Sequence, residues 1–343
     1  MRDDKMPRSL YYIELINAFK QHFTLIEDDD PRQADFYIPH EDMICEWNWP
    51  HHATKDAHYK LSNSQTNYVR GHSRQVGTKQ AWDANGLLVS YVYHLCQWAA
   101  KNPDKKLFIL NMHPWYSLTA NLRLYPNIYY ARACAVTHEL SMMNKIISFP
   151  APPIQRGKGQ FQAGTRKFKA SFQGVNSHEC RQKLTELHND NDIIVKLFQS
   201  DRHQHIRLDA MQDQTDIKTG DYEYRSLMEN SDFAFVPRGD ALYSYRLLEA
   251  MSFNTIPIII SDGWLLPFHR TVPWPLFSLH VSSDRIKFIP NILNRIPPEK
   301  ILAMRRHLSH WYQNSFANIG CFLKQNIEEI EAIDHYVERY DQF

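Results

Sequence analysis

The sequence has no excess of charge of either sign, no long apolar run and no paired cysteine motif. Its 343 residues carry 39 Lys and Arg against 38 Asp and Glu, so nucleic acid is not expected as the main partner. No window reaches the roughly 18 apolar residues that a membrane helix needs, so no integral membrane segment is expected. The five cysteines are scattered without a C-x-x-C pair, which indicates a reducing compartment rather than a disulfide framework or zinc knuckle.

The most informative stretch is residues 231–268, which predicts a βαβ unit. A short apolar strand at 232–236 precedes a sharp turn at 237–240, a helix over 244–253 and an apolar strand over 255–261. The near-continuous apolar composition of the last strand is typical of a parallel sheet that is covered on both faces. Ligands of such sheets bind beyond the carboxyl ends of strands, next to helix amino termini. We therefore expect a nucleotide-phosphate site after residue 236.

The residue types at this position suit phosphate. Gly239 permits a tight turn, and Arg238 offers a fork of donors that matches phosphate oxygens. Ser244 stands at the expected helix start, and Arg246 and Glu249 share one helix face because they are three residues apart. The alternative is that Arg246 and Glu249 form a surface ion pair worth less than about 1 kcal/mol, with Arg238 a solvated loop residue.

The same stretch closely resembles the motif of the exostosin-like glycosyltransferases. The matching pieces are PRG at 237–239, SYRLLEA at 244–250 and SDGWLLPF at 261–268. Further segments similar to the family are DPRQADFYIP at 30–39, KASFQG at 169–174 followed by Arg181, and EKILAMR at 299–305. Nearly the whole chain is covered by the resemblance.

The resemblance implies an α/β fold of the GT-B class, with two Rossmann-like parallel-sheet domains that face a cleft. We expect an acceptor domain at 1–155, a nucleotide-sugar domain at 156–315 and a C-terminal helix at 316–343 that packs back on the first domain. The Pro- and Gly-rich segment 151–159 is the expected linker. Other expected elements are a helix at 11–23, a strand at 34–39, a helix at 82–100, a strand at 106–110 and two helices over 297–343.

The resemblance also implies an inverting, metal-independent transfer of a sugar from a UDP-sugar to a glycan hydroxyl, without a cofactor. Xylose, galactose and glucuronic acid are examples of the sugar. In this interpretation Glu249 holds the ribose, and Arg238 and Arg246 hold the diphosphate. Arg181 reaches the diphosphate as well, and Asp262 bonds the donor sugar.

Inverting transfer needs a general base, which is expected on a loop after a strand of the first domain. Asp42 is the first candidate and Glu41 the second, since both follow the strand at 34–39. The alternative is that one of them caps the next segment or pairs with His51 or His52.

Other polar and aromatic residues have two interpretations each. Asn111 and His113 follow the strand at 106–110 and could line the acceptor site, although turn and cap roles are the more common use of such residues. Trp264 and Phe268 could pack against base or sugar, and core packing is the alternative, favoured for Phe268.

Metal sites are not expected. The D-x-D patterns at 28–30 and 190–192 both precede strands, which indicates solvated turns. The histidine pairs 51–52 and 203/205 lack the H-E-x-x-H pattern of a zinc enzyme.

Two rival functions remain. One is a non-catalytic family member that binds glycan or stabilises a partner subunit; an intact set of diphosphate residues argues against it. The other is a sugar phosphorylase or epimerase. Because the chain opens with Met and runs directly into domain sequence, we expect a soluble cytoplasmic form, as in microbes or viruses. A truncated form of a Golgi protein is the alternative, since eukaryotic members of the resembled family are typically anchored there.

Overall fold

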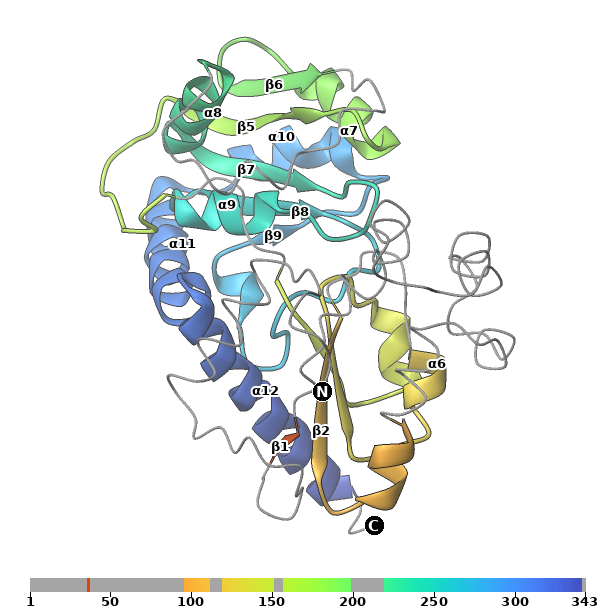
Figure 1. Cartoon of the computed structure of the whole chain (residues 1–343). Helices are drawn as coiled ribbons and strands as arrows, with labels where there is room; N and C mark the ends of the chain where they lie inside the picture. Colours follow the sequence, from red (N-terminus) through yellow and green to blue (C-terminus); the bar gives the residue numbers. More distant parts are fainter. Residues whose placement is uncertain (1–35, 38–95, 112–118, 151–156, 199–218, 341–343) are drawn as a thin grey trace, which may run out of the picture. The chain divides into compact units, whose positions relative to one another are not determined.

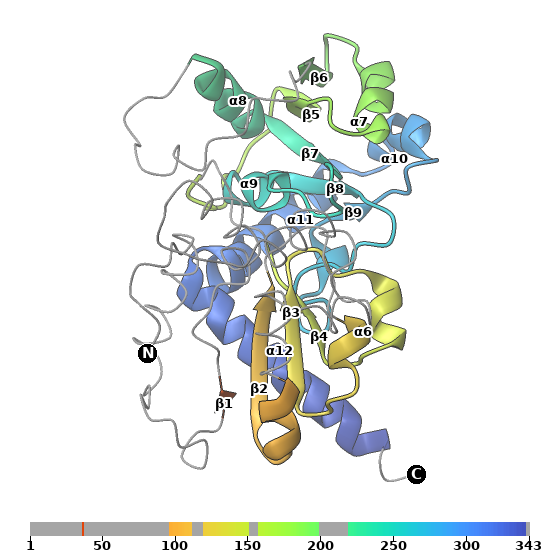
Figure 2. The same ribbon diagram turned by 45° about the vertical axis from the view of Figure 1, so that its right-hand side comes forward.

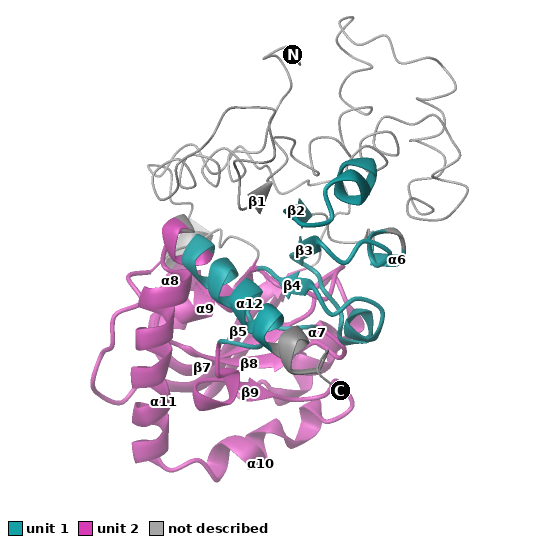
Figure 3. Ribbon diagram, turned by 90° about the horizontal axis from the view of Figure 1, so that it is seen from below, with its two compact units in different colours: residues 1–149, 265–271, 323–343 teal, residues 150–264, 272–322 magenta. Residues whose placement is uncertain are grey.

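The computed structural model describes residues 36–37, 96–111, 119–150, 157–198 and 219–340. The chain folds into two compact units, shown in two colours in Figure 3. Unit 1 comprises residues 1–149, 265–271 and 323–343, and unit 2 comprises residues 150–264 and 272–322. The helix expected at 11–23 and most of the helix expected at 82–100 lie outside the described residues.

Unit 1 contains a parallel sheet with the strand order β1-β2-β3-β4 (Figure 2). Its strands are β1 (Phe36–Tyr37), β2 (Lys106–Asn111), β3 (Ile128–Arg132) and β4 (Ile146–Ser148). Its described helical segments are residues 96–101, α6 (Thr119–Leu122), the 3-10 turn η3 (Thr137–Ser141) and α12 (Ile319–Tyr340), which belongs to this unit from residue 323. Every residue of β3 and β4 is buried, as parallel strands between two covering layers require.

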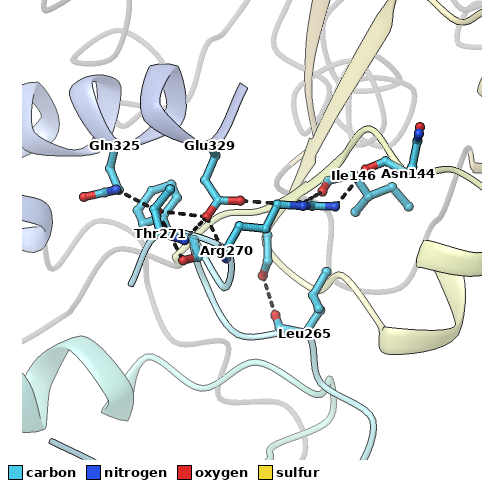
Figure 4. A network of polar contacts seen from close by, with 9 residues as sticks. Asn144, Ile146, Leu265, Arg270, Thr271, Gln325 and Glu329 are labelled. Carbon is cyan, nitrogen blue, oxygen red and sulfur yellow. Dashed lines mark hydrogen bonds and ion pairs between the residues drawn. The ribbon is translucent and has the colours of Figure 1, made fainter. Parts of the chain in front are cut away.

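The segment 265–271 is tied to unit 1 by a buried carboxylate on α12 (Figure 4). Glu329 is fully buried, and its Oε1 accepts hydrogen bonds from the backbone N–H of Arg270 and of Thr271, both at 2.9 Å. The guanidinium of Arg270 extends the network, because Nη1 donates to the carbonyl of Ile146 at 2.9 Å. These bonds explain why segment 265–271 belongs to unit 1, whereas the sequence placed it within a second domain of residues 156–315.

Unit 2 contains a five-stranded parallel sheet with the order β6-β5-β7-β8-β9 (Figure 1). The strands are β5 (Phe168–Val175), β6 (Ile193–Phe198), β7 (Ser231–Pro237), β8 (Ile256–Ile260) and β9 (Leu279–His280). In chain order this is 2-1-3-4-5, one of the two common orders of doubly wound α/β sheets. All five residues of β8 are buried, which confirms the interpretation of that apolar run as a central strand.

Helices connect and cover the strands of unit 2. Figure 1 shows α8 and α9 on the same side of the sheet; α8 contacts β5 and β7, and α9 contacts β7 and β8. The elements are α7 (Glu179–Leu184), η4 (Thr185–Leu187), α8 (Thr219–Glu229), α9 (Arg246–Ser252), η6 (Trp274–Leu276), η7 (Ile286–Phe288), α10 (Ile289–Asn294), α11 (Pro298–Trp311) and the π-helical turn η8 (Tyr312–Phe316).

The predicted α/β class with two parallel-sheet units is confirmed. The two helices expected over 297–343 are present as α11 and α12, and the second extends into unit 1. The predicted boundary at residues 155 and 156 falls in 151–156, outside the described residues. The cleft between two facing domains stays a prediction.

Candidate active site

The sheet of unit 2 has a topological switch point between β5 and β7. The chain runs from β5 outward to β6 and then returns to the other side of β5 at β7. In open α/β sheets, ligands bind outside the carboxyl ends of the strands at such a point. Because β5 ends at Val175 and β7 ends at Pro237, the loops that follow these two residues form the candidate site.

Arg246, the first residue of α9, points its guanidinium at this position. The guanidinium carbon lies 5.0 Å from the centre of the Phe172 ring and 4.6 Å from the centre of the Tyr224 ring. A Cβ atom at Gly174 would lie only 3.0 Å from Nη2 of Arg246. Glycine at position 174 therefore leaves the space that the guanidinium occupies, and two aromatic faces hold it there.

Glu249, one turn along α9, is buried and bound by Tyr224. The phenol OH of Tyr224 donates to Oε2 of Glu249 at 2.6 Å, and the same oxygen lies 4.0 Å from Nε of Arg246. Burial and the neighbouring carboxylate of Glu249 raise the pKa of Tyr224 well above its ordinary value, against the opposing effect of Arg246. The phenol therefore keeps its proton and remains a donor.

Arg181 on α7 joins the two loops of the candidate site. Its Nε donates to the backbone carbonyl of Arg238 at 2.9 Å, and its Nη1 donates to the carbonyl of Val175 at 2.9 Å. A Cβ atom at Gly239 would lie 3.1 Å from Nη2 of Arg181. The loop after β7 thus approaches Arg181 so closely that a larger residue than glycine would push the guanidinium away.

The two guanidinium groups create a site of positive charge with unused donors. Arg181 lies 5.6 Å from the same Phe172 ring that Arg246 contacts. Burial, with the charge of Arg246, lowers the pKa of Arg181 to about 10, so it remains protonated at neutral pH. Within the described residues, neither the buried Nη1 of Arg246 nor the buried Oγ of Ser177 has a hydrogen-bond partner. A bound anion would supply both the missing acceptor and the missing negative charge.

Arg238 makes a hydrogen bond within its own loop, and Ser244 lies before α9 rather than at its first residue. Arg238 Nη2 donates to the carbonyl of Asp240 at 3.2 Å, a bond within its own loop. The helix expected to begin at Ser244 begins at Arg246, with Tyr245 as N-cap and no side-chain cap bond. Ser244 is buried, and its carbonyl accepts from the N–H of Leu247. The expected helix start was therefore two residues too early, and the phosphate role of Ser244 stays a prediction.

Asp262 follows β8 and fastens a neighbouring loop. Its Oδ2 accepts hydrogen bonds from the N–H and the Oγ of Ser283, at 3.1 and 2.5 Å. Although partial burial acts in the opposite direction, the bonds from Ser283 hold the pKa of Asp262 below its usual range. The carboxylate is ionised at neutral pH. Its predicted contact with the donor sugar stays a prediction.

The predicted general bases, Asp42 and Glu41, lie outside the described residues, and so does His113. Asn111 is the last residue of β2, and its Nδ2 donates to the OH of Tyr130 at 2.6 Å inside unit 1. Phe268 is fully buried and packs edge-to-face on Phe149, so the core interpretation is confirmed for this residue. Trp264 is also buried.

The D-x-D pattern at 190–192 forms a turn at the amino end of β6. Oδ1 of Asn189 accepts from the backbone N–H of Asn191, Asp192 and Ile193, and Asp190 adopts a φ of 58°. This confirms the interpretation as a turn. The pattern at 28–30 and the histidines at 51–52 and 203/205 lie outside the described residues. Among the residues that the structure describes, no three His, Cys, Asp or Glu side chains are grouped to hold a metal ion.

Sequence reasoning missed three residues of the candidate site. Tyr224, Phe172 and Ser177 lie on α8, on β5 and in the loop after β5, and each contacts or neighbours an arginine of the site. In the sequence, Phe172 and Tyr224 have the pattern of ordinary core residues, since aromatic side chains on buried faces are common. Gly174, close to the carboxyl end of β5, was the one local indication that this loop belongs to the candidate site.

The strand order of unit 2 defines a doubly wound α/β protein, and the paired guanidinium groups and the buried carboxylate form a candidate anion-binding site at its switch point. A family model described as "Exostosin GT47 domain" matches residues 26–296, and the chain therefore belongs to the exostosin GT47 family of glycosyltransferases.

Similar proteins with established names include exostosins of animals. Exostosin-1 of Drosophila melanogaster is 31% identical over 154 residues, which are 45% of this chain and 20% of that protein. Exostosin-1b of Danio rerio and Exostosin-1 of Bos taurus are each 29% identical, over 168 and 172 residues, or 48% of this chain and 22% of those proteins. The matches thus span about a fifth of the length of these relatives.

Solved structures with partial likeness include two proteins. The crystal structure of the GtfA/B complex has a TM-score of 0.38 at 11% identity, covering 72% of this chain and 60% of that one. The N-terminal domain of Candida albicans trehalose-6-phosphate phosphatase has a TM-score of 0.37 at 11% identity, covering 81% of this chain and 82% of that one. Across the part of the chain that is described, no helix combines the length and the apolarity needed to cross a membrane.

Proposed function

We propose that the chain is an inverting, metal-independent glycosyltransferase that moves a sugar from a UDP-sugar to a hydroxyl of a glycan acceptor. In this proposal unit 2 binds the nucleoside diphosphate at its switch point. The observation that carries it is the pair of half-buried guanidinium groups, Arg181 and Arg246, on one aromatic ring, together with the buried Nη1 of Arg246, for which no described residue is an acceptor. Membership of the exostosin GT47 family supports sugar transfer as the reaction.

The residues have distinct proposed tasks. Arg246 and Arg181 stabilise the negative charge that develops on the departing diphosphate, as fixed cationic donors do in a partly buried site. Arg238 provides a further cation, Ser244 contributes from the loop just before α9, and Gly239 gives the phosphates access to the backbone. Glu249 receives the ribose hydroxyls, and Asp262 contacts the donor sugar.

The reaction balances without a cofactor. The acceptor oxygen forms a bond to the anomeric carbon, and the bond between that carbon and the diphosphate oxygen breaks. The acceptor proton passes to the general base, for which Asp42 is the first candidate and Glu41 the second, and UDP leaves with the bonding electron pair. Attack on the face opposite the leaving group inverts the configuration.

The first test is calorimetric titration of the purified chain with UDP, with and without EDTA. We expect binding that is the same in both conditions. A screen for UDP release across UDP-xylose, UDP-galactose, UDP-glucuronic acid and UDP-N-acetylglucosamine then identifies the donor by slow hydrolysis of one sugar.

Matched variants connect the binding to the site. Arg246→Ala and Glu249→Ala should weaken UDP binding, whereas Lys183→Ala, an exposed change on α7, should not. Absence of UDP binding in every condition would refute the proposal and favour a non-catalytic family member that binds glycan or a partner subunit.

A further inference from the structure

Tyr224 contacts both of the residues to which the proposed function assigns the ribose and the diphosphate. Its ring lies 4.6 Å from the guanidinium carbon of Arg246, and its OH donates to Glu249 Oε2 at 2.6 Å. It is 22 residues before Arg246 and comes from another helix, α8. One side chain therefore supports two proposed ligand contacts through two separate chemical groups.

The hydroxyl binds the oxygen of Glu249 that lies near Arg246. Oε2 of Glu249 lies 4.0 Å from Nε of Arg246, whereas a charge-assisted hydrogen bond between such groups is about 2.7–2.9 Å long. The bond from Tyr224 to the same oxygen is 2.6 Å long and is therefore the closer of the two contacts. Without that bond, Glu249 loses a donor that fixes the position of its carboxylate.

The ring has a separate task. The faces of Tyr224 and Phe172 fix the plane of the Arg246 guanidinium, and Gly174 leaves the space for its Nη2. A guanidinium held in this way loses little conformational freedom when an anion binds. The buried Nη1, which no described residue accepts, is the group that this arrangement presents.

We propose that Tyr224 is a positioning residue of the nucleotide site, whose OH sets Glu249 for the ribose and whose ring sets Arg246 for the diphosphate. This inference rests on the proposed function. It assigns to α8, a helix that carries none of the family motifs quoted above, a share in the affinity for the nucleotide.

The test separates the two groups of the side chain. Tyr224→Phe removes the OH and keeps the ring, and Tyr224→Leu removes both. Calorimetry with UDP and with inorganic pyrophosphate distinguishes the ribose from the phosphates. We expect Tyr224→Phe to weaken UDP binding about 10-fold, the effect of one charge-assisted hydrogen bond, with a smaller effect on pyrophosphate. Tyr224→Leu should weaken both ligands.

A double-mutant cycle distinguishes the specific interaction of Tyr224 with Glu249 from a general loss of stability. In a Glu249→Gln background, Tyr224→Phe should cause less than a 2-fold further change, because the hydroxyl acts through the carboxylate. Tyr312→Phe removes another buried phenol of unit 2, on η8, and should leave UDP affinity unchanged. It serves as the matched control.

The outcomes are distinguishable. If the unmodified protein does not bind UDP, the proposed function fails. If it binds UDP and Tyr224→Phe binds UDP equally well, or if the effects of Tyr224→Phe and Glu249→Gln are additive, the positioning role of Tyr224 is refuted while the nucleotide site stands.

Discussion

Arg181 donates a hydrogen bond from Nε to the backbone carbonyl of Arg238, and this 2.9 Å contact fastens the loop after β7 to the helix after β5. The second bond of the same guanidinium, to the carbonyl of Val175, fixes the end of β5 itself. Two strands that meet at the switch point thus share one clamp. Both bonds require the planar guanidinium, because its Nε and Nη1 are separate donors that reach two different carbonyl oxygens.

Arg181→Lys should therefore loosen both loops although the positive charge remains. A lysine ammonium lacks the planar fork that spans two acceptors. We expect faster hydrogen exchange in residues 175–178 and 238–241 and UDP affinity reduced about 10-fold, the cost of roughly one charged hydrogen bond. Lys183→Ala, on the same helix but exposed, is the control. Unchanged exchange in both loops would show that Arg181 does not clamp them.

Gly174→Ala should disturb the candidate site by steric conflict, without any change of charge. The added Cβ would lie 3.0 Å from Nη2 of Arg246 and 3.0 Å from the ring of Phe172, so the guanidinium or the ring must move. We expect weaker UDP binding together with a loss of stability of about 1–3 kcal/mol, as for other overpacked sites.

The control for this change is Gly164→Ala. That position has a φ of 120°, which strains any L residue, and no atom within 4 Å of the added Cβ. It should lower the melting temperature and leave UDP affinity unchanged. If Gly174→Ala loses stability and retains full affinity, the close approach to Arg246 has no role in binding.

Glu329→Gln should destabilise unit 1. The carboxylate is fully buried and accepts the N–H groups of Arg270 and Thr271, and removal of its charge leaves the half-buried guanidinium of Arg270 without its counter-charge (Figure 4). Removing one partner of a buried pair costs about 3 kcal/mol or somewhat more. Urea-induced unfolding, followed by hydrogen exchange in β4 and α12, measures the loss. Glu331→Gln, exposed on the same helix, should change stability by less than about 0.5 kcal/mol.

His269 should make the stability of the protein fall in mild acid. Burial, with the charge of Arg270, lowers the pKa of His269 from 6.5 to about 4. Between these values the unfolded chain takes up a proton and the folded chain does not, so stability is complete above pH 6.5 and declines as pH falls toward 4. The slope is at most about 1.4 kcal/mol per pH unit, and partial solvent access reduces it.

The measurement compares melting temperatures at neutral pH and near pH 5. His269→Gln should lose part of the acid sensitivity of the unmodified protein; His280, whose pKa is also lowered by partial desolvation, accounts for another part. His307→Gln, an exposed change on α11, should behave like the unmodified protein. Equal acid sensitivity in all three proteins would contradict the assignment to His269.

Asp42→Asn tests the proposed base. Loss of the carboxylate removes the acceptor for the proton of the attacking hydroxyl, so turnover should fall at least about 100-fold. The affinity for UDP should stay nearly unchanged, because the residues proposed to bind the nucleotide belong to unit 2. Glu41→Gln is the paired variant. If Asp42→Asn keeps full turnover and Glu41→Gln does not, the second candidate is the base.

The strands of the central βαβ unit were predictable because their signals are local. Apolar runs bounded by a Pro-Arg-Gly turn and by Ser-Asp-Gly indicate β7 and β8 within a residue or two of their ends. The start of α9 was less accessible, since Ser244 is a residue type that favours helix caps and yet Tyr245 occupies that position.

Contacts between distant segments could not be predicted. The bond from Tyr224 to Glu249 joins residues 25 apart on separate helices, and the bond from Thr271 to Glu329 joins residues 58 apart. Neither residue of either pair carries a pattern that specifies its partner. The assignment of 265–271 to unit 1 depends on such bonds, so a division of the chain into consecutive domains was bound to miss it.

The position of Glu329 on α12 also means that one support of unit 1 is synthesised late. All nine strands of the described sheets precede residue 281 in the chain, whereas the carboxylate that binds Arg270 and Thr271 emerges from the ribosome some fifty residues later. The strands of unit 2 and its helices up to residue 322 have been translated by then. The strands of unit 1 are therefore translated well before the helix that binds segment 265–271, and segments that wait for such contacts expose apolar surface that is prone to aggregate.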